Sequence, residues 1–177
     1  MDLKRLIEVA RGDAPADLVF ANARIVNTFT GELEEGNVAV SQGRVAGVGD
    51  YRYARQVIDL GGRYLAPGFI DGHVHLESSY LHVGQYARAV VSRGTLAAVT
   101  DLHEVANVAG LEGMRYIMEC ARRVPMELFF MAPSCVPATS LETSGARLEP
   151  EDIKKALRWR RVLGLGEMMN FPGVIGA

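Results

Sequence analysis

The sequence predicts an α/β protein in which a small β module precedes half of a (β/α)8 TIM-like barrel. Three observations predict this fold class. Residues 17–59 alternate short apolar runs with turn-forming residues, as β-strands and their turns do. From residue 64 onward, continuous apolar runs alternate with helical patterns, as in a parallel sheet that is buried on both faces. Ionisable residues gather directly after these apolar runs, where (β/α) barrels build their active sites.

The composition is that of an ordinary globular protein. Of 177 residues, 49% are hydrophobic and 23% are charged, and 19 basic against 21 acidic residues give a net charge of −2. These values exclude a disordered tail, a collagen and a nucleic-acid binder that depends on bulk charge. We therefore expect a folded chain without a nucleic-acid partner.

The sequence also bears on the compartment. No apolar run approaches the ~18–20 residues of a membrane span, and residues 1–5 lack the apolar stretch of a signal peptide. The two cysteines, Cys120 and Cys135, match no zinc motif and are expected to be free thiols in a reducing environment. The sequence thus predicts a cytoplasmic protein that has no membrane partner.

Residues 1–16 are predicted to form a short N-terminal helix. Apolar side chains recur there at helical spacing, at Leu3, Leu6, Ile7 and Ala10. Gly12 is expected to end the helix. Because the polar face carries charges of both signs, we expect this helix to pack against the protein rather than bind a membrane.

Residues 17–63 are predicted to form the β module. The expected strands cover residues 18–26, 38–40, 45–48 and 56–60. Turn-forming residues separate them, at residues 27–36, at Gln42 and Gly43, and at Gly61 and Gly62. These strand and turn lengths are ordinary for a small sheet.

Residues 64–177 are predicted to form the first four β/α units of the barrel. The expected strands cover residues 64–70, 95–100, 126–131 and 162–165, and the expected helices cover residues 79–93, 108–123 and 149–161. A complete barrel needs eight units and roughly 250 residues. We therefore expect either part of a longer protein or an open α/β fold.

A histidine pair at the end of the first of these strands is the sharpest chemical signal. In an extended chain, residues i and i+2 point to the same side, so His73 and His75 are positioned to bind one metal ion. Asp71 faces the same way and is expected to orient one of the imidazoles. An H-x-H pair also occurs by chance or in a core, but this pair directly follows an apolar strand.

Other ionisable residues follow the strands at the same predicted edge of the sheet. Glu167 comes after the fourth apolar run and is placed to bridge two metals, although such a carboxylate also serves as a solvated loop residue or a helix cap. His103 and Glu104 follow the second run, and Glu77 lies two residues past His75. Taken alone, these three are equally compatible with structural roles.

The sequence contains no H-E-x-x-H, P-loop, complete G-x-G-x-x-G or cytidine-deaminase motif.

Longer motifs carry a family resemblance. The β module followed by residues 67–75 (PGFIDGHVH) resembles the amidohydrolase superfamily. Four segments in the same order resemble the bacterial and archaeal adenine deaminases within it: residues 73–79 (HVHLESS), 101–108 (DLHEVANV), 133–139 (PSCVPAT) and 165–174 (LGEMMNFPGV). Leu96 and Leu102 depart from the residues that are usual there, and neither replaces an obvious ligand. Family members are much longer, so later histidine and aspartate ligands are absent from this chain.

The resemblance implies a binuclear metal centre that hydrolyses adenine to hypoxanthine and ammonia in purine salvage. His73, His75 and Glu167 would bind metal, with Mn²⁺ expected and Fe²⁺ or Zn²⁺ as alternatives. Metal coordination would turn water into a strong nucleophile near neutral pH, and carboxylates would carry its proton to the departing nitrogen. Beside Glu167, the expected catalytic residues are His103 and Glu104. Asp71, Glu77 and Asn170 are expected to bind substrate or to orient ligands.

The resemblance further implies that the β module is a small β-sandwich within a composite domain. Two alternative functions stay open. The chain could belong to another cyclic amidohydrolase, of the dihydroorotase or deacetylase type, but these often bridge their metals with a carboxylated lysine where Glu167 stands. It could also be a non-catalytic assembly unit. Because half a barrel exposes strand edges and apolar faces, we expect the isolated chain to form homo-oligomers and to have little activity.

Overall fold

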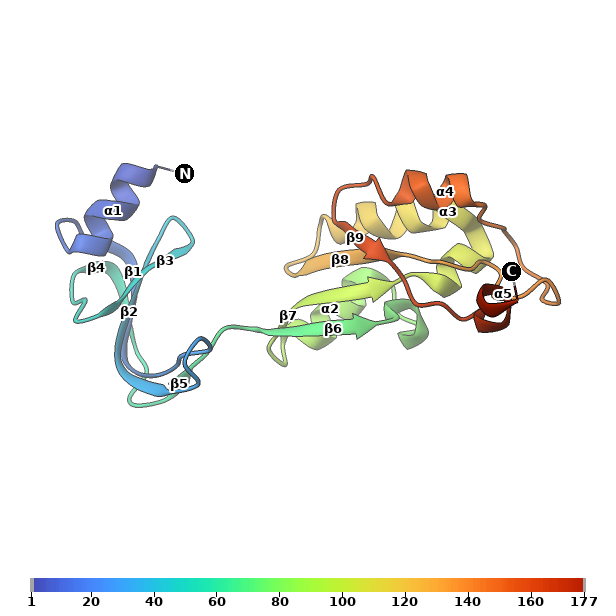
Figure 1. Cartoon of the computed structure of the whole chain (residues 1–177). Helices are drawn as coiled ribbons and strands as arrows, with labels where there is room; N and C mark the ends of the chain where they lie inside the picture. The colour runs from blue at the N-terminus through green and yellow to red at the C-terminus, as the bar shows by residue number, and fades with distance from the viewer. Residues whose placement is uncertain (1, 177) are drawn as a thin grey trace. The chain divides into compact units, whose positions relative to one another are not determined.

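The computed structural model describes residues 2–176 and divides the chain into two compact units, between Pro67 and Gly68 (Figure 1). The division lies just beyond the predicted boundary after Arg63. No helix within residues 2–176 combines the length and the apolar character needed to cross a lipid bilayer.

The first unit consists of one helix and one five-stranded sheet. Its elements are α1 (Leu3–Arg11), β1 (Ala16–Val26), β2 (Leu33–Ser41), β3 (Arg44–Gly49), β4 (Ala54–Asp59) and β5 (Tyr64–Leu65). The strand order is β3-β2-β1-β4, and β5 pairs with β1. A small core joins helix to sheet through Val9, Ala16, Val19 and Ala39. The described strands of this unit form a single layer, not the two layers of a sandwich.

Within residues 1–16, α1 spans Leu3–Arg11, and its two ends show why it forms there. Asp2 caps the start by accepting a hydrogen bond from the Arg5 N–H to its side chain, at 3.3 Å. Gly12 ends the helix with a φ of 81°, in the left-handed region that favours glycine.

We expect Gly12→Ala to lower the free energy of unfolding of the chain by about 1 kcal/mol, because alanine is strained at positive φ. Chemical denaturation measures this loss. Gly12→Asn is the control, since asparagine tolerates the left-handed region and should lose less. Equal stability of Gly12→Ala and the unchanged protein would contradict the prediction.

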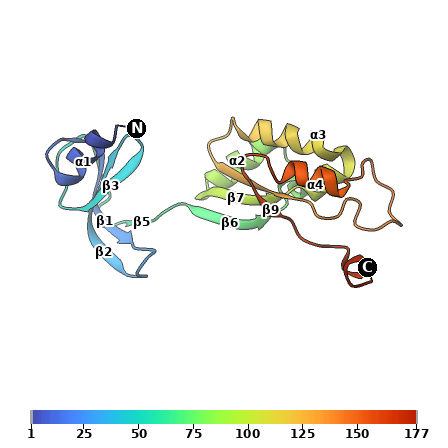
Figure 2. The ribbon, with the colours of Figure 1, turned by 45° about the horizontal axis from the view of Figure 1, so that its top comes forward.

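The second unit is a parallel four-stranded sheet with the order β6-β7-β8-β9. Its strands are β6 (Phe69–Val74), β7 (Thr95–Asp101), β8 (Glu127–Ala132) and β9 (Val162–Leu165). Its helical segments are η1 (Leu76–Ser79), α2 (Val83–Val91), α3 (His103–Ala121), α4 (Pro150–Ala156) and α5 (Phe171–Ile175). Figures 1 and 2 show α2, α3 and α4 on the same side of this sheet. The sheet and its connecting helices confirm the predicted α/β class.

The main core lies between this sheet and its helices. Leu128 and Phe130 of β8 are buried there with Leu102, Met114 and other side chains of α3 and its approach. Burying side chains of this size contributes roughly 1.5–3 kcal/mol each. The core therefore fixes the sheet firmly, and the residues that follow each strand extend from a rigid edge.

One predicted strand proved to be two. Residues 64–70 were expected to form one strand, but Tyr64–Leu65 pairs with β1 of the first unit and Phe69–Val74 forms β6. Pro67 lies between them and has no N–H to donate to a ladder, so the strand is interrupted there.

Three predicted helices have different ends. α2 begins at Val83 rather than at residue 79, because Tyr80 has a φ of 58° and His82 caps the helix. α3 begins at His103 rather than at residue 108 and continues across a kink at Gly110, whose φ is 58°. α4 ends at Ala156, five residues before the predicted end at residue 161. Arg161 itself has a φ of 71°, which is outside the helical region. His103 and Glu104 therefore lie on the first turn of a helix.

Candidate metal centre

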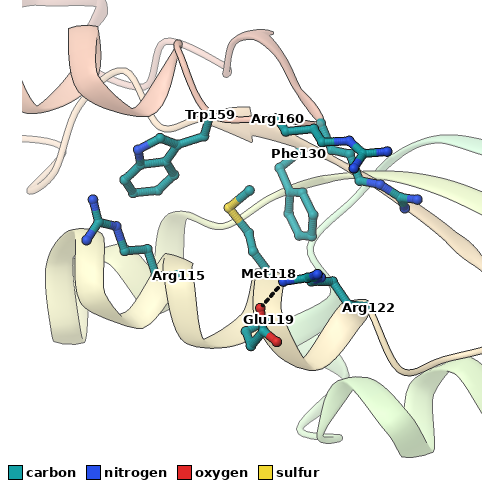
Figure 3. A pocket seen from close by; sticks show the side chains of 8 residues that line it. Arg115, Met118, Glu119, Arg122, Phe130, Trp159 and Arg160 are labelled. Atoms are coloured by element: carbon teal, nitrogen blue, oxygen red, sulfur yellow. Dashed lines mark hydrogen bonds and ion pairs between the residues drawn. The ribbon is translucent and has the colours of Figure 1, made fainter.

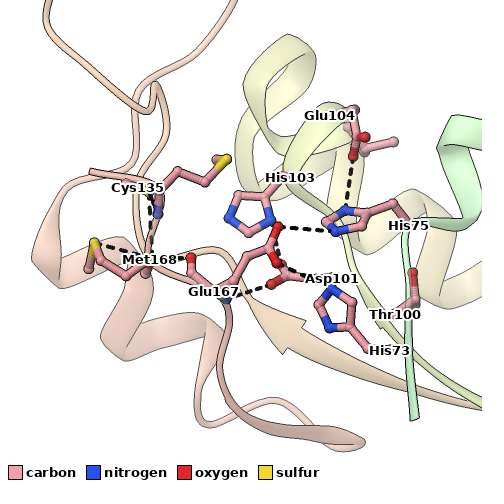
Figure 4. A network of polar contacts seen from close by, with 12 residues as sticks. His73, His75, Thr100, Asp101, His103, Glu104, Cys135, Glu167 and Met168 are labelled. Atoms are coloured by element: carbon pink, nitrogen blue, oxygen red, sulfur yellow. Dashed lines mark hydrogen bonds and ion pairs between the residues drawn. The ribbon is translucent and has the colours of Figure 1, made fainter. Parts of the chain in front are cut away.

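His73, His75 and Glu167 come together at the carboxyl edge of the second sheet (Figure 4). His73 lies near the end of β6, His75 directly follows it, and Glu167 lies just after β9. One ligand atom from each of the three side chains lies within 4.8 Å of the others. His73 Nε2 is 3.3 Å from Glu167 Oε2, and His75 Nε2 is 3.2 Å from Glu167 Oε1.

These separations fit a shared metal ion. Ligand atoms that bind a tetrahedral ion at about 2.0–2.1 Å lie roughly 3.3 Å apart. The nitrogen-to-oxygen distances of 3.2 and 3.3 Å match that spacing. Two imidazoles and a carboxylate also form a mixed donor set suited to divalent transition metals such as manganese, iron and zinc.

Glu104 supports His75 from the other side of its ring. Its Oε2 lies 3.3 Å from His75 Nδ1, although Nδ1 makes no hydrogen bond among residues 2–176. The Ser78 hydroxyl donates to Glu104 Oε1 at 2.6 Å. Although burial opposes it, this hydrogen bond and the neighbouring His75 lower the pKa of Glu104. A carboxylate at Nδ1 favours the tautomer that leaves Nε2 free to bind a metal.

Glu104→Gln is expected to weaken Zn²⁺ binding by the chain roughly 10- to 100-fold, the usual effect of losing a carboxylate behind a histidine ligand. Isothermal titration calorimetry measures the change. Glu112→Gln, an exposed glutamate on the same helix, is the control and should bind like the unchanged chain. An unaltered affinity in Glu104→Gln would contradict the arrangement.

Asp101, at the end of β7, links this strand to Glu167, which follows β9. Its side chain is 0% exposed, and one of its two oxygens, Oδ2, accepts a hydrogen bond. The Glu167 main-chain N–H donates to Asp101 Oδ2 at 2.9 Å, and His103 Nδ1 lies 2.9 Å from Oδ1. Gly166 allows this approach, because a Cβ there would lie 2.1 Å from Asp101 Oδ2. Asp101 thus fixes Glu167 relative to β7.

His103 is buried, with 6% of its surface exposed. Burial acts to lower the pKa of His103, but Asp101, together with the nearby Cys135 and Glu167, raises it above its usual value. Its Nε2 is buried without a hydrogen-bond partner among residues 2–176. A buried polar atom of this kind needs a partner, which a bound molecule would supply.

Glu77 lies behind the cluster rather than in it. Its Oε1 accepts a hydrogen bond from the Val105 N–H at 3.5 Å. Burial, with the neighbouring Glu104 carboxylate, raises the pKa of Glu77 to about 7. Raised carboxyl pKa values of this kind occur frequently at functional sites.

The remaining two predicted residues have local contacts. Asp71 accepts a hydrogen bond from the main-chain N–H of His73 at 3.2 Å, so the carboxylate beside a ligand imidazole is Glu104 instead. Asn170 caps α5 by accepting from the Gly173 N–H at 3.1 Å. Neither side chain joins the three-residue cluster.

A hollow of about 360 Å³ opens beside the cluster. Residues that line it include His75, His103, Glu104, Glu167, Asn107 and Cys135. The last two, like Asp101, were not among the predicted site residues. The position of Asp101 at the end of an apolar strand could have indicated it, whereas Asn107 lay in a stretch interpreted as a loop.

Residues 64–169, more than half of the chain, match the family described as the amidohydrolase family. The chain belongs to the amidohydrolase family. This amidohydrolase is 57% identical over 174 residues to the adenine deaminase of Dehalococcoides mccartyi, covering 98% of this chain and 30% of that protein. It is 52% identical over 173 residues to adenine deaminase 2 of Carboxydothermus hydrogenoformans, with the same two coverages of 98% and 30%. The chain thus spans about 30% of the length of these curated relatives.

Solved structures resemble this amidohydrolase at low sequence identity. The N-acyl-D-glutamate deacylase of Bordetella bronchiseptica aligns with a TM-score of 0.64 and 16% identity, covering 92% of this chain and 40% of that one. The atrazine chlorohydrolase of Arthrobacter aurescens aligns with a TM-score of 0.62 and 14% identity, covering 89% and 48%. These likenesses agree with the predicted fold class.

Proposed function

We propose that this chain supplies part of the metal centre of an enzyme that hydrolyses adenine to hypoxanthine and ammonia. The observation that carries the proposal is the convergence of His73, His75 and Glu167 at 3.2–3.3 Å. The relatives named as adenine deaminases support the choice of substrate, because they match nearly the whole chain.

His73, His75 and Glu167 would hold divalent metal, for which we propose Mn²⁺ in a binuclear centre. Fe²⁺ and Zn²⁺ suit the same donors. Such a metal, when bound, supplies Lewis acidity that makes water nucleophilic near neutral pH. We propose that Glu167, whose two oxygens lie 3.2 and 3.3 Å from the two imidazoles, would help to hold both ions of such a centre.

The protein's own groups would handle protons and orientation. Glu104 holds the His75 ring from Nδ1, and Asp101 holds the main chain of Glu167. His103 lines the hollow and keeps Nδ1 toward Asp101, which leaves Nε2 to exchange a proton with the departing nitrogen of the substrate. Glu104 lines the same hollow and is the second candidate for proton transfer. Asp71, Glu77 and Asn170 would then act only by supporting these groups.

We further propose a cytoplasmic enzyme of purine salvage that acts on a small molecule and forms homo-oligomers. The net charge of −2 supports the absence of a nucleic-acid partner. Size-exclusion chromatography with light scattering measures the molar mass in solution. A stable monomer would contradict the prediction of homo-oligomers.

Release of ammonia from adenine by the full-length protein that carries this segment tests the activity. We expect turnover with adenine, none with dihydroorotate, and loss of turnover in Glu167→Ala. Turnover of dihydroorotate or of acylated amino acids in place of adenine would overturn the choice of substrate. A full-length protein that binds metal and turns over neither class would support a non-catalytic assembly unit instead.

A further inference from the structure

The segment that carries Glu167 has little side-chain packing to hold it in place. The Glu167 side chain is 45% exposed, and the next two residues, Met168 and Met169, are exposed as well. A metal ligand on such a segment keeps its direction only if other contacts fix its main chain. In this protein those contacts come from polar side chains at or just beyond the ends of β7 and β8.

Ser134, two residues beyond the end of β8, holds the main-chain carbonyl of Glu167. Its hydroxyl donates to the Glu167 carbonyl oxygen at 2.6 Å, a short O–H···O distance. The same hydroxyl lies 3.6 Å from Cys135 Sγ and 3.8 Å from Met168 Sδ. Because a serine hydroxyl has one proton and sulfur is a weak acceptor, the Glu167 carbonyl is its main acceptor.

Asp101 and Ser134 together hold both main-chain polar groups of Glu167. Asp101 Oδ2 accepts from the Glu167 N–H at 2.9 Å, and Ser134 donates to the Glu167 C=O. These two groups belong to different planar peptide units, one on either side of the Glu167 Cα. Fixing both planes fixes the φ and ψ angles of Glu167, and with them the direction of its Cα–Cβ bond. With Asp101 alone, the second plane would be free to turn.

The residues on either side of Glu167 are bonded as well. The Gly166 N–H donates to the Ala132 carbonyl at 2.7 Å, and the Met169 N–H donates to Cys135 Sγ at 3.3 Å. Figure 4 shows Glu167 between Cys135 on one side and Asp101 on the other. The Ser134 contact is therefore one part of a continuous set of bonds that fixes the main chain from Gly166 to Met169.

We propose that Ser134 is a positioning residue of the metal centre, whose hydroxyl fixes the peptide after Glu167 and so directs the carboxylate toward His73 and His75. The carboxylate oxygens lie 3.3 and 3.2 Å from these two imidazoles. The inference rests on the proposed function, because it takes Glu167 as a metal ligand. Groups that orient a ligand typically contribute about 10- to 100-fold to metal affinity, and this exposed bond belongs at the lower end.

Isothermal titration calorimetry of the chain with Zn²⁺ tests this role. We expect Ser134→Ala to bind Zn²⁺ about tenfold more weakly than the unchanged chain. Ser134→Thr keeps the hydroxyl and should bind within about threefold of the unchanged chain. Ser92→Ala is the matched control and should bind like the unchanged chain, since the Ser92 hydroxyl also donates to a main-chain carbonyl, that of Ala89, at the end of α2.

A second measurement separates positioning from general stability. Trp159, the only tryptophan of the chain, lines a hollow with Met118 and Phe130 (Figure 3). It precedes β9, whereas Glu167 follows that strand, so its fluorescence during chemical denaturation reports on folding away from the metal centre. We expect the metal-free Ser134→Ala and Ser92→Ala chains to unfold at similar denaturant concentrations, although only Ser134→Ala loses Zn²⁺ affinity.

Two results would overturn the proposal. If Ser134→Ala binds Zn²⁺ as tightly as the unchanged chain, with or without a loss of stability, Ser134 has a structural role only. If Ser134→Thr loses as much affinity as Ser134→Ala, the hydroxyl is not the group responsible. Failure of the unchanged chain to bind Zn²⁺ would instead refute the proposed function, and the role of Ser134 with it. Because the titration does not involve adenine, a wrong choice of substrate would not alter its outcome.

Discussion

Zn²⁺ binding by the chain is expected to fall more than roughly 100-fold in Glu167→Ala and in His73→Ala. Loss of a residue behind a ligand already costs about 10- to 100-fold, and these residues are themselves the proposed ligands. Glu167 should have the larger effect, because its two oxygens lie against both His73 and His75. Zn²⁺ is the better probe, since it binds nitrogen and oxygen donors more tightly than Mn²⁺.

Isothermal titration calorimetry gives the affinities, and His82→Ala is the matched control. His82 caps α2 and contacts the Tyr116 hydroxyl at 3.3 Å, away from the cluster. Its replacement should leave Zn²⁺ affinity unchanged. If Glu167→Ala binds within threefold of the unchanged chain, the three side chains are not the metal ligands and the proposed function loses its main support.

Gly166→Ala should lower the free energy of unfolding by about 2–3 kcal/mol, as overpacking of a well-filled interior does. The added methyl group would lie 2.1 Å from Asp101 Oδ2 and 2.7 Å from Oδ1. Because Asp101 is 0% exposed, its carboxylate would have to shift within the protein interior to avoid this contact. The substitution therefore separates Asp101 from the Glu167 N–H, and a buried acceptor that loses its donor costs further stability.

Gly164→Ala, two residues earlier on β9, is the matched control for chemical denaturation. Its added methyl would meet Met131 Cε at 3.5 Å, an ordinary contact, so it should be neutral or slightly stabilising. Asp101→Ala combined with Gly166→Ala supplies a second check. In the Asp101→Ala background, Gly166→Ala should lower the free energy of unfolding much less, and a double-mutant cycle measures the difference. If the two losses of unfolding free energy were additive in the double variant, the prediction that the added methyl group clashes with the Asp101 carboxylate would be contradicted.

Much of the fold and part of the site followed from periodicity. The four apolar runs after residue 64 predicted consecutive parallel strands, and the sheet has the order β6-β7-β8-β9. The i, i+2 spacing of His73 and His75 predicted that both rings would share one side, and both reach Glu167. Glu167 could be anticipated because the carboxyl ends of parallel strands meet at one edge.

The contacts that support the ligands could not be predicted in the same way. Glu104, rather than Asp71, lies beside a ligand ring because α3 begins at His103. The residue before this helix, Leu102, makes no side-chain cap hydrogen bond, so no capping signal marked the start at His103, and the helix was placed five residues too late. The role of Asp101 depends on its reaching from β7 past β8 to the end of β9, which no local pattern records.

The hold of Asp101 on the main chain of Glu167 has a consequence for metal uptake. When the sheet folds, the hydrogen bond to Asp101 fixes the main chain of Glu167 before any metal binds. Metal binding should therefore cost little conformational entropy of the backbone. Unlike zinc fingers, whose fold depends on the metal, this unit should keep its secondary structure when a chelator strips it. The Glu167 carboxylate already faces both imidazoles, at 3.2 and 3.3 Å, so metal uptake should require little rearrangement of this side chain.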